Sequence, residues 1–423
     1  MQAWEAKPLG DLCVFQRGLT YGKSDQVDVS SNVVLRANNV DLATHTLDLS
    51  DLRYIADSVS VPATKKVCRG SLLICTASGS KSHVGKVAYI DENYGYAFGG
   101  FMGQITPGAA IDGRFLFYAL TSPSFKAVIK ALSDGVNINN LKFDDLKQFA
   151  VPIPPLSEQR RIVAILDEAF EAVATAKANT EMCLRKAQEL FASRMRRLFA
   201  QEEGWQRVQL GELLARGWIT SHLDGNHGSD YPKKEEFVLS GVPYIAASAI
   251  KDGVVNLDEA KYLSVQRAST IKKGLAKDRD VLFAHNATVG PVAILETNEE
   301  HIILGTSLTY YRCDPKCICP EYLAHFMRSP AFTSQYAQVM KQSTRNQVPI
   351  TKQREFFHVI PPIDIQRRIA QDLDELAAQN VRLTDLQVRK LAALDELKRS
   401  LLHQAFSGGL TAKSTDRQVA ETA

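Results

Sequence analysis

The feature that most constrains this chain is an internal repeat. The segment PPLSEQRRI, residues 154–162, returns 207 positions later as PPIDIQRRI, residues 361–369. The correspondence continues without a gap, so that Leu166 falls on Leu373 and Phe199 falls on Phe406. Two copies of one pattern predict two related structural units.

The repeat also extends backwards into longer stretches of mixed composition. Pro123 meets Pro330 at the same offset, whereas near the two starts Trp4 meets Trp205 at an offset of 201, so the length changes lie in these stretches. A chain of 423 residues is also too long for one compact core. We expect globular domains at residues 1–152 and 201–359, helical regions at 153–200 and 360–407, and a flexible tail at 408–423.

The two gap-free segments favour unusually long helices. Neither proline nor glycine occurs in residues 156–203 or 363–407, so no residue of either segment is a strong helix breaker. Ser157 and Asp364 follow the proline pairs at positions suited to an N-cap.

Apolar and small residues recur along both segments at steps of three and four, as in a coiled-coil seam. In the first segment they are Ile162, Leu166, Ala169, Val173, Ala176, Thr180, Cys183, Ala187 and Leu190. In the second they are Ile369, Leu373, Leu376, Asn380, Leu383, Leu386, Leu394, Leu397 and Leu401. We expect an antiparallel coiled coil whose register the polar Asn380 helps to fix.

The alternative is that each helix packs on its own domain. At about 1.5 Å per residue the first helix would be about 65 Å long, which exceeds the edge of a domain of about 150 residues and favours pairing.

The globular stretches mix strand and helix patterns. GSLLICTA, KVAYI, DVLFAH and PVAILE are short apolar runs typical of strands, whereas RFLFYALTSPSFKAVIKAL and PEYLAHFMRSPAFTSQYAQVM have helical periodicity. We therefore expect an α+β fold class, with two globular α/β-mixed domains alternating with two long helices in a pseudo-twofold arrangement.

The composition is that of an ordinary globular protein. Its 50 Lys and Arg against 47 Asp and Glu give a net charge of +3, so affinity for a polyanion must come from local clustering. No apolar run could span a membrane and no secretory signal is present, so we expect a cytoplasmic protein without a membrane partner. Seven scattered cysteines indicate free thiols, and the spacing of Cys313, Cys317 and Cys319 lacks the second half of a zinc site.

Catalytic motifs are missing from the sequence. GLTYGKS, residues 18–24, resembles a phosphate-binding loop but has three residues between its glycines where four are needed. Neither a nucleophile elbow, nor a zinc-protease pair, nor a dinucleotide fingerprint occurs. The tetrapeptide typical of amino-group methyltransferases, Asn-Pro-Pro-aromatic or Asp-Pro-Pro-aromatic, is also missing from the sequence. We therefore expect a protein that is not an enzyme and carries no metal or cofactor.

Two polar loops occupy matching places in each half. Residues 78–86 correspond to 285–291, and residues 133–140 correspond to 341–347. Their side chains are of the kinds that read base edges and hold phosphates, although solvated loops without a ligand would look similar. The candidates for DNA contact are Lys81, Ser82, His83, Lys86, Asn137, Asn139, Asn140, His285, Asn286, Thr288, Thr344, Arg345, Asn346 and Gln347.

The repeated PLSEQRRIVAILD signature, placed after each of two globular stretches, resembles the specificity subunit of Type I DNA restriction-modification systems. The resemblance covers nearly the whole chain. One departure is visible, because Ile365 stands in the second copy where the first has Glu158, so an acidic contact or cap is expected in one half only.

The resemblance implies a protein that binds double-stranded DNA and performs no chemistry itself. Each target-recognition domain would read one half of a bipartite, asymmetric target, and the helices would set the spacing. Two modification subunits, which hold S-adenosylmethionine and methylate adenine at N6, and restriction subunits that use ATP and Mg would be its partners.

The helix starts are the candidate surface for the modification subunits. Two similar helices could recruit two copies of one partner, although side chains at a helix start can equally be solvated or capping. The candidate residues are Gln159, Arg160, Arg161, Gln366, Arg367 and Arg368.

Two other functions remain open. A specificity subunit of a bipartite Type II system would look almost the same in sequence. A coiled-coil scaffold that does not bind DNA is the alternative from a different class, and it predicts no salt-dependent duplex binding.

Overall fold

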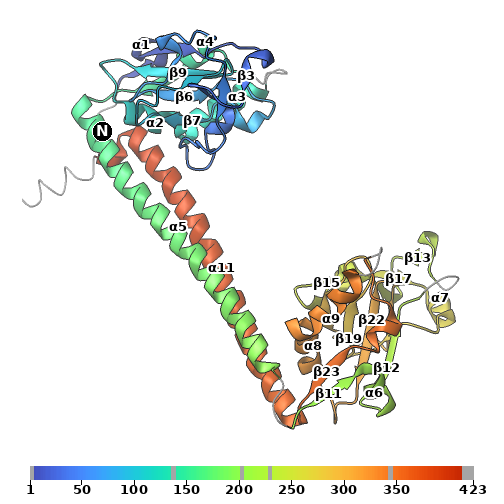
Figure 1. The fold of residues 1–423 in the computed structure, drawn as a ribbon. Helices are drawn as coiled ribbons and strands as arrows, with labels where there is room; N and C mark the ends of the chain where they lie inside the picture. The colour runs from blue at the N-terminus through green and yellow to red at the C-terminus, as the bar shows by residue number, and fades with distance from the viewer. Residues whose placement is uncertain (1–3, 135–139, 201–203, 227–230, 342–345, 412–423) are drawn as a thin grey trace, which may run out of the picture. The chain divides into compact units, whose positions relative to one another are not determined.

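The structure is a computed structural model that describes residues 4–134, 140–200, 204–226, 231–341 and 346–411 (Figure 1). It divides into two compact units, residues 1–181 with 388–423, and residues 182–387. Each unit therefore contains one globular domain and one part of each long helix.

The first globular domain has two four-stranded sheets among its described residues. One has the antiparallel order β2 (Cys13–Arg17), β9 (Met102–Pro107), β6 (Leu72–Cys75) and β7 (Val87–Tyr89). The other has the order β3 (Gln26–Val27), β5 (Arg53–Ile55), β4 (Asn32–Leu35) and β8 (Ala97–Phe98). The remaining elements are β1 (Ala6–Pro8), which pairs with β10 (Ala150–Pro152), and helices α1 (Leu9–Leu12), α2 (Gly113–Thr121), α3 (Pro123–Asp134) and α4 (Phe143–Lys147).

The second globular domain repeats this plan with more strands in each sheet. One has the order β12 (Ile219–Asp224), β22 (Leu308–Cys313), β19 (Val281–Ala284), β20 (Val292–Ile294), β16 (Val254–Val255) and β15 (Ile250–Lys251). The other has the order β13 (Phe237–Val238), β17 (Lys261–Leu263), β14 (Val242–Ile245), β21 (Ile302–Leu304) and β18 (Leu275–Ala276). The remaining elements are β11 (Gln206–Gln209), which pairs with β23 (Phe357–Ile360), and helices α6 (Leu210–Ala215), α7 (Val265–Thr270), α8 (Pro320–Arg328), α9 (Pro330–Lys341) and α10 (Ile350–Gln353).

Each predicted helical stretch of the globular domains forms two helices. The second helix of each pair, α3 or α9, begins at a proline, Pro123 or Pro330, because proline cannot continue the hydrogen bonding of the helix before it. The first helix of each pair covers one face of the main sheet. Phe115 of α2 lies in one core with Ile74 of β6, and Phe326 of α8 lies in one core with Phe283 of β19.

The long helices are α5 (Leu156–Leu198) and α11 (Ile363–Ser407), of 43 and 45 residues. Each begins one residue before its predicted N-cap, so Ser157 and Asp364 lie inside the first turn and the N-cap prediction is wrong. The mixed helix and strand class and the two long helices are confirmed.

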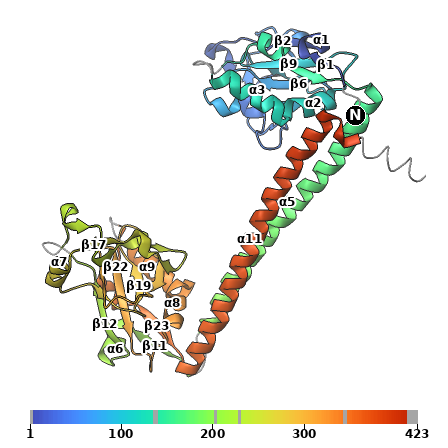
Figure 2. The ribbon, with the colours of Figure 1, turned by 180° about the vertical axis from the view of Figure 1, so that it is seen from behind.

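Within each unit the two helix segments run side by side and antiparallel (Figure 2). In the first unit Ile162 and Leu166 share a core with Leu402 and Ala405. In the second unit Met195 and Phe199 share a core with Ile369 and Leu373. The same order appears in the exposed ion pairs Lys177–Asp395 and Arg194–Asp372.

The seam differs from the predicted one at several positions. Cys183, Leu190, Leu386 and Leu397 are exposed. Beyond Thr180 the half-buried residues of α5 are Leu184, Ala187, Phe191, Ala192, Arg194 and Leu198, of which Ala187 was predicted.

Candidate DNA interface and helix starts

In the first unit the two predicted polar loops meet beyond the end of β6. Ala77 forms an antiparallel bridge with Asn140, and the N–H of Leu141 donates to the carbonyl of Thr76 at 2.6 Å. Phe101 joins the same point, because its carbonyl accepts hydrogen bonds from the N–H groups of Thr76 and Ala77 at 2.9 and 3.1 Å. We call this meeting of three segments the loop junction.

The second unit has an equivalent loop junction. Asn286 forms an antiparallel bridge with Gln347, and the N–H of Val348 donates to the carbonyl of His285 at 2.8 Å. The N–H of His285 donates in turn to the carbonyl of Ser307 at 3.0 Å. The two predicted polar loops of each half therefore lie together in both domains.

The loop that follows the strand differs in length between the two junctions. In each unit a glycine, Gly85 or Gly290, returns the loop to the last residue of the strand through a main-chain hydrogen bond. The first unit has residues 76–84 in between and the second has only residues 285–289. The shorter loop turns at Ala287, whose φ of 64° lies in the left-handed region.

Most of the described DNA-contact candidates present their side chains at or beside the junctions. Ser82, Asn140, Thr288 and Asn346 are exposed, and His83, Asn286 and Gln347 are half-buried. The main chain of Lys81 lies in the short helix Lys81–His83. The amide of Asn346 also donates to the carbonyl of Ala287 at 2.6 Å, so one of its hydrogen bonds holds the loop. Asn137, Asn139, Thr344 and Arg345 lie outside the described residues.

Two candidates are buried instead. Lys86 is 5% exposed, and its ammonium donates to the carbonyl of Val40 at 2.6 Å. Burial lowers the pKa of this lysine. His285 is 1% exposed, and its Nδ1 lies 3.0 Å from the carbonyl of Val348. This geometry argues against our predictions that Lys86 contacts phosphate and that His285 contacts DNA, because both side chains bond to main chain inside the domain.

The first glutamine of the repeated QRRI signature is buried where its helix meets the globular domain. Gln159 is 0% exposed. Its Oε1 accepts from the N–H of Asp112 at 2.8 Å, and its Nε2 donates to the carbonyls of Ala110 and Pro154 at 3.0 and 2.9 Å. One side chain thus links the start of α5 to the turn before α2.

The second glutamine repeats this arrangement. Gln366 is 0% exposed, accepts from the N–H of Cys319 at 2.9 Å, and donates to the carbonyls of Cys317 and Pro361 at 2.9 and 2.8 Å. This geometry argues against our prediction that Gln159 and Gln366 contact a partner subunit, because both side chains are buried and hydrogen-bonded within their own units.

The four arginines of the signature remain at the surface. Arg160, Arg161, Arg367 and Arg368 are exposed. Arg161 lies 3.8 Å from Glu158 and Arg367 lies 3.8 Å from Asp364, so these ion pairs are long and exposed and contribute little to stability. Ile365, which replaces the acidic residue in the second copy, packs against the core of its domain.

A second contact ties each domain to its long helix, and the sequence patterns did not indicate it. In the first unit Tyr118 of α2 donates to the carboxylate of Asp167 on α5, and Arg114 lies 2.6 Å from the same carboxylate. At the matching positions of the second unit, Nε2 of His325 lies 2.7 Å from Oδ1 of Asp374. The one sequence signal for this contact was that the aspartate occurs at the same position in both copies of the repeat.

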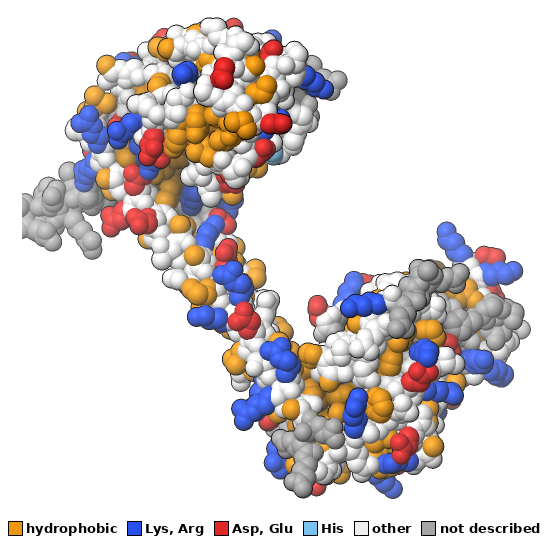
Figure 3. Space-filling model, viewed as in Figure 1, with side chains coloured by type: hydrophobic (Ala, Val, Ile, Leu, Met, Phe, Trp, Pro, Cys, Tyr) orange, Lys and Arg blue, Asp and Glu red, His pale blue; other side chains and the backbone are white. Residues whose placement is uncertain are grey.

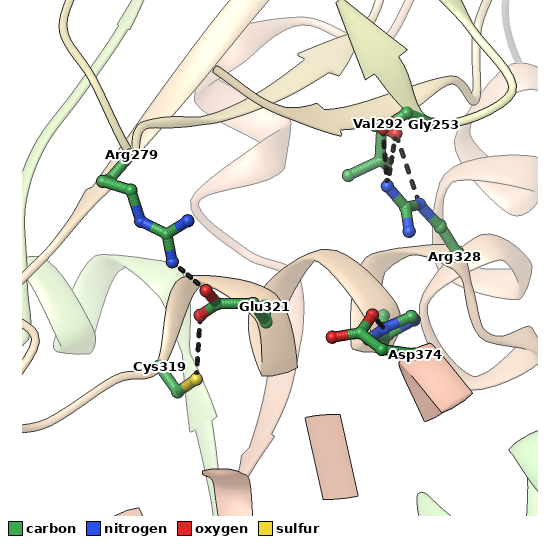
Figure 4. Close-up of polar contacts among 8 residues, drawn as sticks. Gly253, Arg279, Val292, Cys319, Glu321, Arg328 and Asp374 are labelled. Carbon is green, nitrogen blue, oxygen red and sulfur yellow. Dashed lines mark hydrogen bonds and ion pairs between the residues drawn. The ribbon is translucent and has the colours of Figure 1, made fainter. Parts of the chain in front are cut away.

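The surroundings of this contact have diverged between the units. Glu321 occupies the position of the first unit's arginine and instead pairs with Arg279 and accepts from the thiol of Cys319 at 3.1 Å (Figure 4). Burial lowers the pKa of His325. Burial therefore favours the neutral imidazole, which can still hydrogen-bond to Asp374.

The described residues contain no cluster of three or more His, Cys, Asp or Glu side chains that could hold a metal ion. All seven cysteines are free. None of the helices within the described ranges is long and apolar enough to cross a membrane. On the face drawn in Figure 3, Lys and Arg side chains are interspersed with Asp and Glu over both units.

The repeated architecture matches a known protein family. The sequence profile described as "Type I restriction modification DNA specificity domain" matches residues 1–181 and 202–391. The chain belongs to this family. The prediction of a non-catalytic specificity subunit of a Type I restriction-modification system is thereby confirmed.

Similar specificity subunits cover almost the whole chain. The specificity subunit of the Type I restriction enzyme EcoKI from Escherichia coli (strain K12) is 25% identical over 433 residues, which cover 97% of this chain and 90% of that protein. The StySPI specificity subunit from Salmonella potsdam is 23% identical over 438 residues, with the same two coverages.

Solved structures of the family share the fold. A chain from a study of complex assembly and conformational transition of the type I R-M system has a TM-score of 0.75 at 19% identity, covering 97% of this chain and 99% of that one. The HsdS subunit from Thermoanaerobacter tengcongensis has a TM-score of 0.62 at 19% identity, covering 97% of this chain and 98% of that one.

Proposed function

We propose that each globular domain reads one half of a bipartite, asymmetric DNA target and that the two long helices set the spacing between the halves. The observation that carries this proposal is the pair of loop junctions. Their main-chain bonding is equivalent, whereas their loops differ in length and in side chains. Related frames that present different polar groups suit the reading of two different base sequences.

The domain limits follow the same division of labour. Residues 1–152 and 201–359 are the target-recognition domains, and residues 153–200 and 360–407 are the spacer regions. The predicted flexible tail begins later than residue 408, because Leu410 packs against the core of the first unit and Thr411 is 5% exposed; residues 412–423 lie outside the described residues. The protein acts in the cytoplasm, where its double-stranded DNA target lies, and it holds no cofactor of its own.

The helix starts recruit two modification subunits, one at each copy of the signature. Arg160, Arg161, Arg367 and Arg368 support this proposal, because all four side chains are exposed at matching positions of the two copies. The modification subunits carry S-adenosylmethionine and methylate adenine at N6. Restriction subunits, which use ATP and Mg, complete the assembly.

The test is to map methylated adenines in cells that carry domain-exchange variants. Replacing residues 1–150 by the equivalent domain of a relative should change one half-site only. One four-residue insertion in each helix, near Lys177 and Thr384, should lengthen the gap by about 6 Å, or close to two base pairs. The division into readers and spacer fails if the exchange alters both half-sites, or if the insertions change the bases that are read.

A bipartite Type II system was the alternative interpretation of the sequence, since its specificity subunit would have the same architecture, and the family match favours the Type I system. Purification with the partner separates the two systems, because the Type II partner combines nuclease and methylase in one chain. A scaffold without DNA affinity would give an assembly that shows no salt-dependent binding to a duplex.

A further inference from the structure

Phe101 is a large apolar side chain that is 72% exposed at the first loop junction. Its main chain is firmly held, because its carbonyl accepts the N–H groups of Thr76 and Ala77 and also the hydroxyl of Thr76 at 2.9 Å. The side chain therefore projects into solvent from a fixed point, and a phenyl ring loses little conformational entropy when it binds.

The fold does not require an aromatic residue at this place. The equivalent residue of the second junction is Ser307. Its carbonyl accepts a hydrogen bond from the N–H of His285, as the carbonyl of Phe101 accepts one from the N–H of Thr76. Ser307 is half-buried, and its hydroxyl accepts a hydrogen bond from the N–H of Ala247 at 2.9 Å. The aromatic ring of the first junction is thus a local feature of one reader.

The segments beside Phe101 carry exposed polar and charged side chains. Asn140 is exposed on the paired segment, and the exposed Lys142 follows it after one buried residue. Arg17 is exposed on β2 and is the register partner of Gly103, two residues after Phe101. An exposed ring among an amide and two cations matches the surface of a nucleic acid, which offers phosphates, polar base edges and a few apolar groups.

We propose that Phe101 contacts the 5-methyl group of a thymine in the half-site read by the first domain. This inference rests on the proposed function. The thymine methyl is the apolar group that a base pair displays in the major groove, where polar side chains read the neighbouring edges. Insertion of the ring between base pairs would first require unstacking, whereas the methyl is accessible in an intact duplex.

The experiment uses the full chain assembled with its modification subunits and a duplex that carries the mapped target. Each thymine of the first half-site is replaced in turn by deoxyuridine, which lacks only the methyl group. At one position the wild-type complex should bind roughly threefold to tenfold more weakly, as expected for the loss of one buried methyl. Phe101→Ser should show a similar loss on the unmodified duplex and no further loss with deoxyuridine at that position.

Val14→Ser is the matched control, because Val14 is 67% exposed on the same sheet and lies away from the loop junction. It should bind all duplexes as the wild type does. The inference is overturned if Phe101→Ser binds normally, if no deoxyuridine weakens the wild type, or if the variant still senses the same methyl. Failure of the wild-type complex to select any target would instead refute the proposed function, and this inference with it.

Discussion

Replacement of Gln159 by alanine tests the idea that the repeated glutamine fastens each helix to its domain. The change removes three hydrogen bonds and leaves the N–H of Asp112 and the carbonyls of Ala110 and Pro154 without their partner. Hydrogen bonds contribute about 0.5 to 1.5 kcal/mol each, so the first unit should lose about 2 to 4 kcal/mol of stability. Gln366→Ala should destabilise the second unit by a similar amount.

Amide hydrogen exchange followed by mass spectrometry measures this loss locally, without assuming that the whole chain unfolds in one step. Peptides that contain Asp112 should exchange faster in Gln159→Ala, and peptides that contain Cys319 should not. Arg160→Ala, at the next and exposed position, is the control and should leave both peptides unchanged. If Gln159→Ala keeps normal protection but loses its modification subunits, the glutamine is a partner contact and the reasoning from burial is wrong.

Three further predictions concern pH, helix pairing and base reading. Burial lowers the pKa of His222 and His358 to about 4 from 6.5, so protonation favours unfolding and the second domain should lose stability as pH falls from about 6.5 to 4. His358→Val, which copies Val151 of the first unit, should flatten this dependence in melting experiments; an unchanged pH profile would contradict it. Asn380→Leu should raise the melting temperature while loosening the helix register, as measured by exchange along α11, and the register role fails if both stay the same. Asn346→Ala should cost roughly 1 to 3 kcal/mol at one base position and leave the other half-site unaffected, whereas uniform weakening on all sequences would identify Asn346 as a positioning contact.

The long helices could be predicted from the sequence because they depend on local properties, namely the absence of proline and glycine and a regular apolar pattern. The same apolar pattern did not predict which residues lie in the seam along the whole length of the helices. A strict seven-residue repeat drifts by about 20° per heptad on a straight α-helix. After Thr180 the half-buried stripe contains Leu184 and Phe191 in place of the predicted Cys183 and Leu190, whereas Ala187 stays in it.

The candidate site was predictable in its location but not in its individual contacts. The repeat identified the loops, and the structure brings them together. Whether a polar side chain faces solvent depends on main-chain groups that come from elsewhere in the chain. The ammonium of Lys86 donates to the carbonyl of Val40, and the side-chain oxygen of Gln159 accepts from the N–H of Asp112. Neither hydrogen bond can be predicted from the spacing of residues in the sequence. Phe101 was missed for the converse reason, because an apolar residue at the start of a strand resembles core.

The two units share the contacts that hold each domain to a helix and differ in the contacts that face outwards. Gln159 and Gln366 make equivalent hydrogen bonds. Asp167 and Asp374 are each contacted from the same position of the repeat, although by a tyrosine in one unit and a histidine in the other. At the loop junctions it is the main-chain hydrogen bonds that recur, and these bonds do not depend on which side chains the loops carry. A loop can therefore change in length and in side chains while the main-chain hydrogen bonds of its junction stay the same. This independence is the physical condition for one scaffold to carry two readers of different DNA sequences.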